Sequence, residues 1–253
     1  MKALRDQRVL VTGGTSAIGR AIVERLGAEG CWVVFTGRDA ERGAALAEAT
    51  DTTFIEADVR EPNAVELAIR KAAEVFDGLE GLVLGAGVLH EARISETTDE
   101  AWDAVMETNL VAPFRFARAS MPLLRAGKGG AIVAIASGTA LWTEMELGAY
   151  SVSKRALLWL SQMLAVEGAP QGVRVNAVCP GDVGAGMSAF VNGRGPRDHG
   201  SAMLPPAGRI GDPADVAGAV AFFLSADAGF CNGTSLTVDG GMRAALRASK
   251  VAG

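Results

Sequence analysis

Tyr150 and Lys154 are the two residues whose types and spacing point most directly to chemistry. Tyr150 is the single tyrosine of the chain, and a lysine follows it by four positions. On a helix, side chains four residues apart lie on one face. A neighbouring ammonium favours the phenolate and lowers the pKa of a phenol from its ordinary value of about 10 towards the range in which it exchanges protons. Because this spacing also occurs on solvated helix faces, the rest of the sequence has to decide between a proton donor and a surface pair.

A glycine-rich turn near the N-terminus is the second such feature. Residues 9–19 read Val-Leu-Val-Thr-Gly-Gly-Thr-Ser-Ala-Ile-Gly, an apolar strand that runs into the start of a helix. Glycines in such a turn let the backbone approach a pyrophosphate, and the amides of the helix N-terminus bind its charge. Turns of this kind also carry glycine for geometry alone, so the turn by itself does not establish a phosphate site.

Short β-branched runs alternate with helical patterns along the whole chain. We predict seven strands, at 9–11, 32–36, 53–57, 82–85, 131–136, 173–178 and 235–238. Strands that alternate with helices form right-handed units around a parallel sheet with helices on both faces. No linker interrupts the pattern, which predicts one domain over residues 1–253. The Gly- and Pro-rich segment at about 184–208 is predicted to be a substrate loop or lid, on the sheet edge where such folds bind ligands.

Composition narrows the classes of partner. The net charge of −5 and the few aromatic residues argue against nucleic-acid binding. No apolar run is long enough to cross a membrane, and the N-terminus lacks a signal-peptide pattern. Cys31, Cys179 and Cys231 are far apart, which suggests neither a metal site nor a disulfide framework. We therefore expect a cytoplasmic protein with no metal, no nucleic-acid partner and no membrane contact.

Several motifs in order resemble the short-chain dehydrogenase/reductase family in its one-domain form, from Gln7 to Gly241. The glycine turn resembles the family's Thr-Gly-x-x-x-Gly-x-Gly motif, with Ala17 in place of a glycine. Residues 84–87, Leu-Gly-Ala-Gly, resemble the Asn-Asn-Ala-Gly motif with both asparagines replaced, and residues 176–181 resemble Asn-x-x-x-Pro-Gly. The resemblance implies a Rossmann-like, doubly wound α/β fold and a nicotinamide cofactor. The cofactor-binding residues that it implies are Gly13, Thr15, Ser16, Ile18, Gly19, Arg38, Asp58, Val59, Ala86, Gly87, Tyr150, Lys154, Pro180, Gly181 and Val183.

The end of the second strand favours NADP(H), with NAD(H) as the alternative. Members that bind NAD carry an acidic residue where this chain has Gly37, and the guanidinium of Arg38 suits a 2′-phosphate. Arg38 as a plain surface charge is the competing interpretation, and Ser16 occupies the family's second basic position. Asp39 is expected to cap the next helix. Asp58 either contacts the adenine amino group, as the resemblance implies, or caps a helix.

Asn109 and Ser137 complete the family's Asn-Ser-Tyr-Lys tetrad with Tyr150 and Lys154. By this resemblance Ser137 and Tyr150 donate hydrogen bonds to a substrate oxygen, Tyr150 transfers the proton, and Lys154 lowers the pKa of Tyr150 and holds the nicotinamide ribose. We place Asn109 in one long helix over 99–125. Because Pro113 has no N–H, we hypothesise that the Asn109 carbonyl holds a water leading to Lys154.

The sequence thus predicts an oxidoreductase that transfers a hydride between NADP(H) and a ketone or secondary alcohol. We expect a homotetramer or homodimer formed through the helices that begin near Asp99 and Ala149. A cofactor-binding regulator without turnover is the alternative, supported by the replacements at Ala17, Gly85 and Ala185, and a cofactor-free lyase is a third. Substrate contacts are predicted from the loops near the tetrad, at Leu89, His90, Gly138, Trp142, Met145, Leu147, Met187 and Phe190.

Overall fold

One parallel sheet organises the protein. The computed structural model describes residues 4–76, 78–126, 130–184 and 204–248. Its strands lie in the order β3-β2-β1-β4-β5-β6-β7, and every neighbouring pair is parallel. The predicted doubly wound, seven-stranded sheet is confirmed. The strands are β1 (Arg8–Thr12), β2 (Trp32–Gly37), β3 (Thr53–Glu56), β4 (Gly81–Leu84), β5 (Gly130–Ile135), β6 (Val173–Pro180) and β7 (Ser235–Val238).

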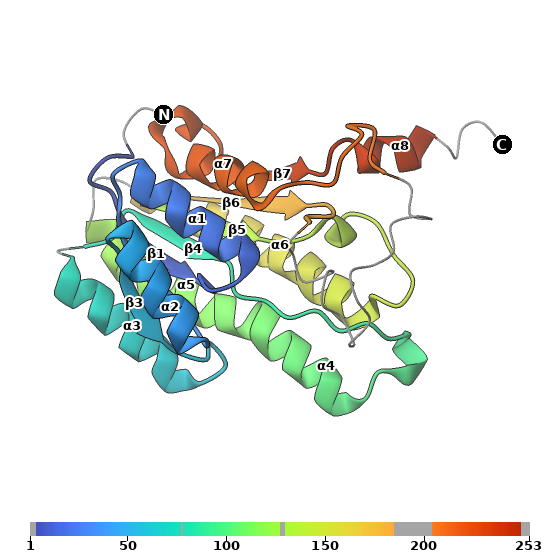
Figure 1. The fold of residues 1–253 in the computed structure, drawn as a ribbon, viewed down its shortest axis with the longest axis horizontal. Helices are drawn as coiled ribbons and strands as arrows, with labels where there is room; N and C mark the ends of the chain where they lie inside the picture. The colour runs from blue at the N-terminus through green and yellow to red at the C-terminus, as the bar shows by residue number, and fades with distance from the viewer. Residues whose placement is uncertain (1–3, 77, 127–129, 185–203, 249–253) are drawn as a thin grey trace.

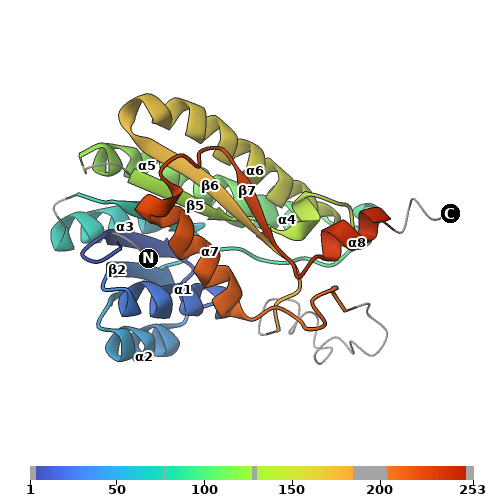
Figure 2. The ribbon, with the colours of Figure 1, turned by 90° about the horizontal axis from the view of Figure 1, so that it is seen from above.

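Helices cover both faces of this sheet (Figures 1 and 2). Helices α1, α2 and α7 pack on one face, and α3, α5 and α6 pack on the other. The helices are α1 (Ala17–Ala28), α2 (Ala40–Thr50), α3 (Pro62–Val75), α4 (Asp99–Met106), α5 (Ala112–Ala126), α6 (Gly148–Gly168), α7 (Pro213–Leu224) and α8 (Met242–Ala248). None of the helices in the described ranges is both long and apolar enough to cross a membrane.

Two separate cores result from the two-residue period of the strands. In β4, Leu82 faces the core under α3, α5 and α6, whereas Val83 faces the core under α1 and α7. Successive side chains of a strand point to opposite faces, so a strand covered on both faces is apolar throughout. Both cores therefore hold the strand ends in fixed positions, and it is from these ends that the functional loops leave.

The prediction of a single long helix over 99–125 was wrong, because the helix is interrupted in its middle. A π-helical turn, Glu107–Val111, separates α4 from α5, and the amide of Ala112 donates to the carbonyl of Glu107, five residues back. Pro113 lies just beyond this turn and has no N–H to continue the α-helical pattern. π-helical turns are frequent at functional sites, and this one contains Asn109, whose side chain is fully buried.

Other boundaries also differ from the sequence predictions. Strand β6 continues to Pro180 instead of ending at Val178, because Pro180 pairs with Val238 at the end of β7. Helix α7 was not predicted. It begins with a capping box between Asp212 and Asp215, a pattern that the sequence does carry. The tail after Gly241, for which the sequence leaves a helix or a subunit contact open, forms α8.

The buried position of Leu82 gives a stability prediction. Leu82→Ala removes side-chain volume from a fully buried site on a central strand, and we expect the free energy of unfolding to fall by about 2–5 kcal/mol. Urea denaturation measures this. The matched change Val75→Ala, at a half-exposed position at the end of α3, is expected to cost less than about 0.5 kcal/mol. Equal losses in both variants would contradict the assignment of the core.

Candidate active site

Tyr150 and Lys154 lie on a buried face of α6. Their exposed fractions are 8% and 2%, so the solvated surface pair that the spacing allowed is not what the chain forms. The Lys154 Nζ lies 5.8 Å from the centroid of the Tyr150 ring and donates a hydrogen bond to the carbonyl of Ile135, at 2.9 Å. That carbonyl is the end of β5. Lys154 therefore ties the start of α6 to the sheet.

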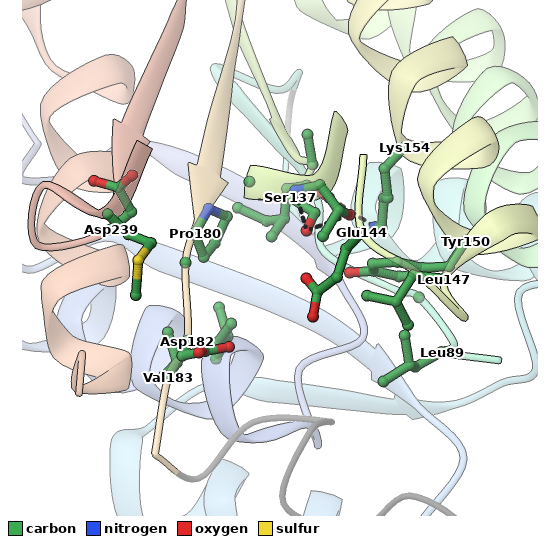
Figure 3. A pocket seen from close by; sticks show the side chains of 18 of the residues that line it. Leu89, Ser137, Glu144, Leu147, Tyr150, Lys154, Pro180, Asp182, Val183 and Asp239 are labelled. Atoms are coloured by element: carbon green, nitrogen blue, oxygen red, sulfur yellow. Dashed lines mark hydrogen bonds between the residues drawn. The ribbon is translucent and has the colours of Figure 1, made fainter. Parts of the chain in front are cut away.

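Ser137 follows β5 and is held by its neighbour Thr139. The Ser137 Oγ accepts from the backbone N–H of Thr139 at 3.2 Å and from the Thr139 Oγ1 at 3.1 Å. A hydroxyl has two acceptor lone pairs and one proton, so its O–H remains as a donor. Figure 3 places Ser137, Tyr150 and Lys154 around one cavity. Thr139 belongs to none of the motifs found in the sequence.

Asn109 clamps the loop after β4 to α6. Its Oδ1 accepts from the N–H of Val88 at 2.8 Å, and its Nδ2 donates to the carbonyl of Val88 at 2.9 Å and to the Ser153 Oγ at 3.0 Å. A Cβ built on Gly87 would lie 3.1 Å from the Lys154 Nζ and 3.3 Å from the Asn109 Oδ1. The side chain of Asn109 therefore holds the loop after β4 against α6, next to Lys154. The water path from its backbone carbonyl stays a hypothesis.

The predicted lowering of the Tyr150 pKa was wrong for the protein alone. Burial raises the pKa of Tyr150 above its ordinary value, and hydrogen bonding from Ser137 opposes this only in part. Burial also lowers the pKa of Lys154 to about 8. The ammonium bonds the Ile135 carbonyl. The spacing of the two residues predicts that they are neighbours, but the desolvation that sets their pKa values depends on packing by distant segments.

A cavity of about 460 Å³ joins these groups to the glycine turn. Ser137, Tyr150 and Lys154 line it together with Ser16, Ala17 and Ile18 at the N-terminus of α1. Three further predicted cofactor residues from the end of β6, Pro180, Gly181 and Val183, line it as well. The backbone on both sides of Val183 pairs with Gly211. In such a bridge the N–H and C=O of Val183 itself point the other way.

A second, smaller cavity adjoins the first along the glycine turn, and Ser16, Gly85 and Gly87 line both. Its remaining predicted cofactor residues are Gly13, Thr15, Arg38, Asp58, Val59 and Ala86. Gly19 lines neither cavity. A Cβ there would lie 2.1 Å from the carbonyl of Gly13, so Gly19 lets α1 approach the turn. The structure thus brings the predicted cofactor residues, apart from Gly19, to two connected cavities.

The turn has the shape that a dinucleotide phosphate requires. Gly13 has φ +76°, and a Cβ there would lie 2.7 Å from the Cα of Ala86, so only glycine fits. The Ser16 Oγ caps α1 by accepting from the N–H of Gly19 at 3.1 Å. Amides at a helix N-terminus bind phosphate. The glycine turn and the first turn of α1 therefore fit a dinucleotide and would hold its pyrophosphate.

Thr12 supplies bonds that the replaced asparagines do not. Its Oγ1 accepts from the amides of Gly85 at 3.1 Å and Ala86 at 3.3 Å, and donates to the carbonyl of Val83 at 3.3 Å. Thr12 is the last residue of β1 and is buried. One hydroxyl thus braces the end of β1 against the loop after β4.

The two aspartates considered as helix caps differ. Asp39 is the N-cap of α2, and its side chain accepts from the N–H of Arg42 at 3.0 Å, as predicted. Asp58 caps no helix, because Glu61 is the N-cap of α3. Its carboxylate instead accepts from Arg60. The helix-cap alternative for Asp58 was therefore wrong.

The predicted substrate residues divide into three groups. Trp142 lines the large cavity, as do Leu89, Gly138 and Leu147. Met145 and His90 do not line it, and their contacts with substrate stay predictions: Met145 is at the tip of a turn with 76% of its surface exposed, and the buried His90 Nε2 has no hydrogen-bond partner among the described residues. Met187 and Phe190, with most of the predicted lid, lie outside the described residues.

Sequence reasoning missed several residues of the cavity. Glu144 points its carboxylate into the cavity from the turn before α6, and Asp182 lies across from it after β6 (Figure 3). Met242, at the start of α8, adds to the apolar wall. These residues stand in irregular segments with no periodicity, so only the folded chain shows that they face Tyr150. Among the described residues, no three potential ligand side chains gather into a metal site.

Comparison with known proteins agrees with this geometry. Residues 13–243 match a family model described as enoyl-(acyl carrier protein) reductase. The 3-oxoacyl-[acyl-carrier-protein] reductase MabA of Mycobacterium tuberculosis is 33% identical over 237 residues, which cover 94% of this chain and 93% of that protein. A dehydrogenase/reductase from Sinorhizobium meliloti is 37% identical with a TM-score of 0.87, over 94% of this chain and 95% of that one. Levodione reductase is 29% identical with a TM-score of 0.89, over 95% and 99%.

The fold and the paired cavities define a nicotinamide-dependent oxidoreductase with a doubly wound sheet. The chain belongs to the short-chain dehydrogenase/reductase family. The resemblance stated from the sequence motifs is thereby confirmed, and so is the coarse activity of a hydride-transferring enzyme that uses a nicotinamide cofactor.

Burial of Lys154 predicts a pH-dependent stability effect. Below about pH 8 the folded protein holds a desolvated ammonium, because the pKa of Lys154 lies at about 8. An unfolded lysine titrates near about 10.4, so this cost is lost as the pH rises from about 8 to 10.4. We expect Lys154→Met to raise the free energy of unfolding at pH 7 by about 1–3 kcal/mol, and the difference from the parent to shrink at about pH 9.5.

Urea unfolding at the two pH values measures this difference. Lys71→Met is the control, because Lys71 lies on the exposed surface of α3 beside Glu74. A Lys154→Met difference that stays constant with pH would show that the lysine folds without a lowered pKa.

Proposed function

We propose that this protein reduces a ketone with NADPH, or oxidises the corresponding secondary alcohol with NADP⁺, using Tyr150 as the general acid or base. The single observation that carries the proposal is the shared cavity: Tyr150, Ser137 and Lys154 line the same space as the first turn of α1. A hydride donor held by that turn would have a proton donor across the cavity from it. Geometry of this kind is what a carbonyl reduction needs.

Each side chain has a role that follows from its contacts. The bound cofactor supplies the hydride. Because Thr139 occupies the acceptor positions of Ser137, the Ser137 O–H donates to the oxygen on which negative charge grows. Tyr150 donates to the same oxygen and releases its proton. Lys154 lies one turn behind Tyr150, and Asn109 holds the loop that carries Gly87 beside it.

The surroundings of Tyr150 suit a general acid near neutral pH. Burial raises the pKa of its phenol, so the group keeps the proton that a carbonyl reduction consumes. In the oxidising direction Tyr150 has to accept a proton as the phenolate, and the raised pKa moves that activity to higher pH.

The residues after β2 support NADP(H) over NAD(H). Arg38 lines the smaller cavity, and a guanidinium pairs well with a phosphate. A Cβ on Gly37 would lie 2.4 Å from the side chain of Thr15. An acidic residue at position 37, the arrangement that suits a ribose with both hydroxyls, would therefore displace Thr15. The smaller cavity suits an adenosine with a 2′-phosphate better than one without it.

The substrate class follows from the wall of the large cavity. Leu89, Trp142, Leu147 and Met242 give it an apolar side, which suits a hydrophobic ketone. The named relatives are reductases of 3-oxoacyl groups and of levodione. Oxidation of NADPH, followed by its absorbance with a panel of 3-oxoacyl thioesters and cyclic ketones, tests the proposal. Tight NADPH binding without turnover across the panel would favour the non-catalytic regulator instead.

Tyr150→Phe is the decisive variant for the mechanism. It removes the phenolic proton and keeps the ring that packs on α6. We expect kcat to fall by about 10²–10⁴-fold, while NADPH affinity and the thermal midpoint change little. Steady-state kinetics and cofactor fluorescence measure these effects. Turnover within about two-fold of the parent would refute the role of Tyr150.

Exposed apolar side chains support the proposed homotetramer or homodimer. Trp159 and Val166 on α6 are 65% and 73% exposed, and Val152, Met163 and Phe114 are at least two-fifths exposed on α6 and α5. Large apolar patches commonly mark interfaces between proteins. We propose that this patch packs against a second copy.

Trp159→Glu tests this interface. We expect light scattering after gel filtration to show a smaller assembly than the parent, because a carboxylate would be buried without a partner. Trp32→Glu is the control, because Trp32 is similarly exposed but lies at the start of β2. An unchanged mass for Trp159→Glu would place the interface elsewhere.

A further inference from the structure

The smaller cavity contains an aspartate between two arginines. Asp58, Arg38 and Arg60 all line it. Arg60 donates several hydrogen bonds to the carboxylate of Asp58. Its Nη2 donates to Oδ2 at 2.6 Å, its Nε lies 3.1 Å from both carboxylate oxygens, and its backbone N–H donates to Oδ1 at 3.0 Å. Arg60 belongs to none of the motifs found in the sequence.

Arg38 has a different relation to the same carboxylate. Among the described residues, no hydrogen bond or ion pair holds its exposed guanidinium. Its charge nevertheless reaches Asp58, because both arginines lower the pKa of that carboxyl, Arg60 more than Arg38. Asp58 therefore pairs with one guanidinium and leaves the other facing the cavity.

The charge balance decides what this part of the cavity attracts. Two guanidiniums and one carboxylate give a net charge of +1. Without Arg60 the sum is zero, and the carboxylate of Asp58 would pair with Arg38 or repel an approaching phosphate. A phosphate monoester carries close to two negative charges at neutral pH. This change in net charge, from +1 to zero, therefore affects the binding of a 2′-phosphate far more than the binding of a ribose hydroxyl.

The ion pair between Arg60 and Asp58 contributes little to the stability of the fold. The side chains of Arg60 and Asp58 are 45% and 24% exposed, and exposed pairs contribute about 0–1 kcal/mol. The backbone of Arg60 is also held, since its carbonyl accepts from the Arg115 Nη1 at 3.4 Å and Arg115 is paired with Glu107. The bonds to Asp58 keep the guanidinium in the cavity wall, at a position that the fold itself does not require to be charged.

We propose that Arg60 is a specificity-determining residue for the cofactor: it occupies the carboxylate of Asp58 so that Arg38 remains available to bind the 2′-phosphate of NADP(H). This inference rests on the proposed nicotinamide function. Arg60 adds a second cation to the site from the loop after β3. The glycine turn adds none, because Ser16 occupies its basic position.

The test is the affinity for NADPH and for NADH, measured by cofactor fluorescence at low salt without substrate. We expect Arg60→Gln to weaken NADPH binding by about ten-fold and to leave NADH binding within about two-fold. Arg60→Lys, which keeps the charge, should retain most of the preference. The double variant Asp58→Asn with Arg60→Gln restores the net charge of +1, and its ratio of NADPH to NADH affinity should return towards that of the parent.

The control is Arg42→Gln, because Arg42 forms a similar exposed pair with Asp39 and does not line the cavity. It should leave both affinities unchanged. Equal loss of NADPH and NADH binding in Arg60→Gln would mean that Arg60 only shapes the adenosine site, and would overturn the inference. So would an unchanged ratio in Arg60→Gln, or a double variant that recovers nothing. Binding of neither cofactor by the parent would refute the proposed function itself.

Discussion

The buried carboxamide of Asn109 is the interaction on which the site depends most. It joins three segments that are distant in sequence: the π-helical turn between α4 and α5, the loop after β4 and the helix that carries Tyr150. Each of its polar atoms has a partner, which a fully buried amide requires. The clamp fixes Gly87 beside Lys154, and Lys154 in turn bonds the end of β5. Removing this amide would therefore loosen α6 and the loop after β4 together.

Burial gives the two chemical groups of α6 opposite shifts. The same desolvation that favours neutral Lys154 also favours protonated Tyr150, because a low dielectric disfavours either charge. At neutral pH the phenol of Tyr150 therefore keeps its proton, and Lys154 is a desolvated ammonium whose pKa lies at about 8. Further charged side chains line the ends of the two cavities, with guanidiniums near β2 and β3 and carboxylates near the turn before α6.

Strands and most helices could be predicted because their patterns are local. Short apolar runs that alternate with helical patterns predicted the sheet. The spaced motifs predicted the residues that meet at its carboxyl edge. What the sequence could not give depended on distant segments. Met145 is exposed and does not line the cavity, whereas the side chain of the adjacent Glu144 turns into it. The direction of the Tyr150 pKa failed for the same reason, since it is set by packing.

The brace between β1 and β4 has a consequence for protein engineering. A Cβ on Gly85 would lie 2.8 Å from the backbone carbonyl of Thr12, so the two strand ends have closed around the glycine. Returning the family's asparagine to position 85 would force them apart and compete with the hydroxyl of Thr12 for the same amides. Substitution towards a consensus commonly stabilises proteins. At position 85 such a substitution would destabilise the protein, because the hydroxyl of Thr12 already binds the amides of Gly85 and Ala86.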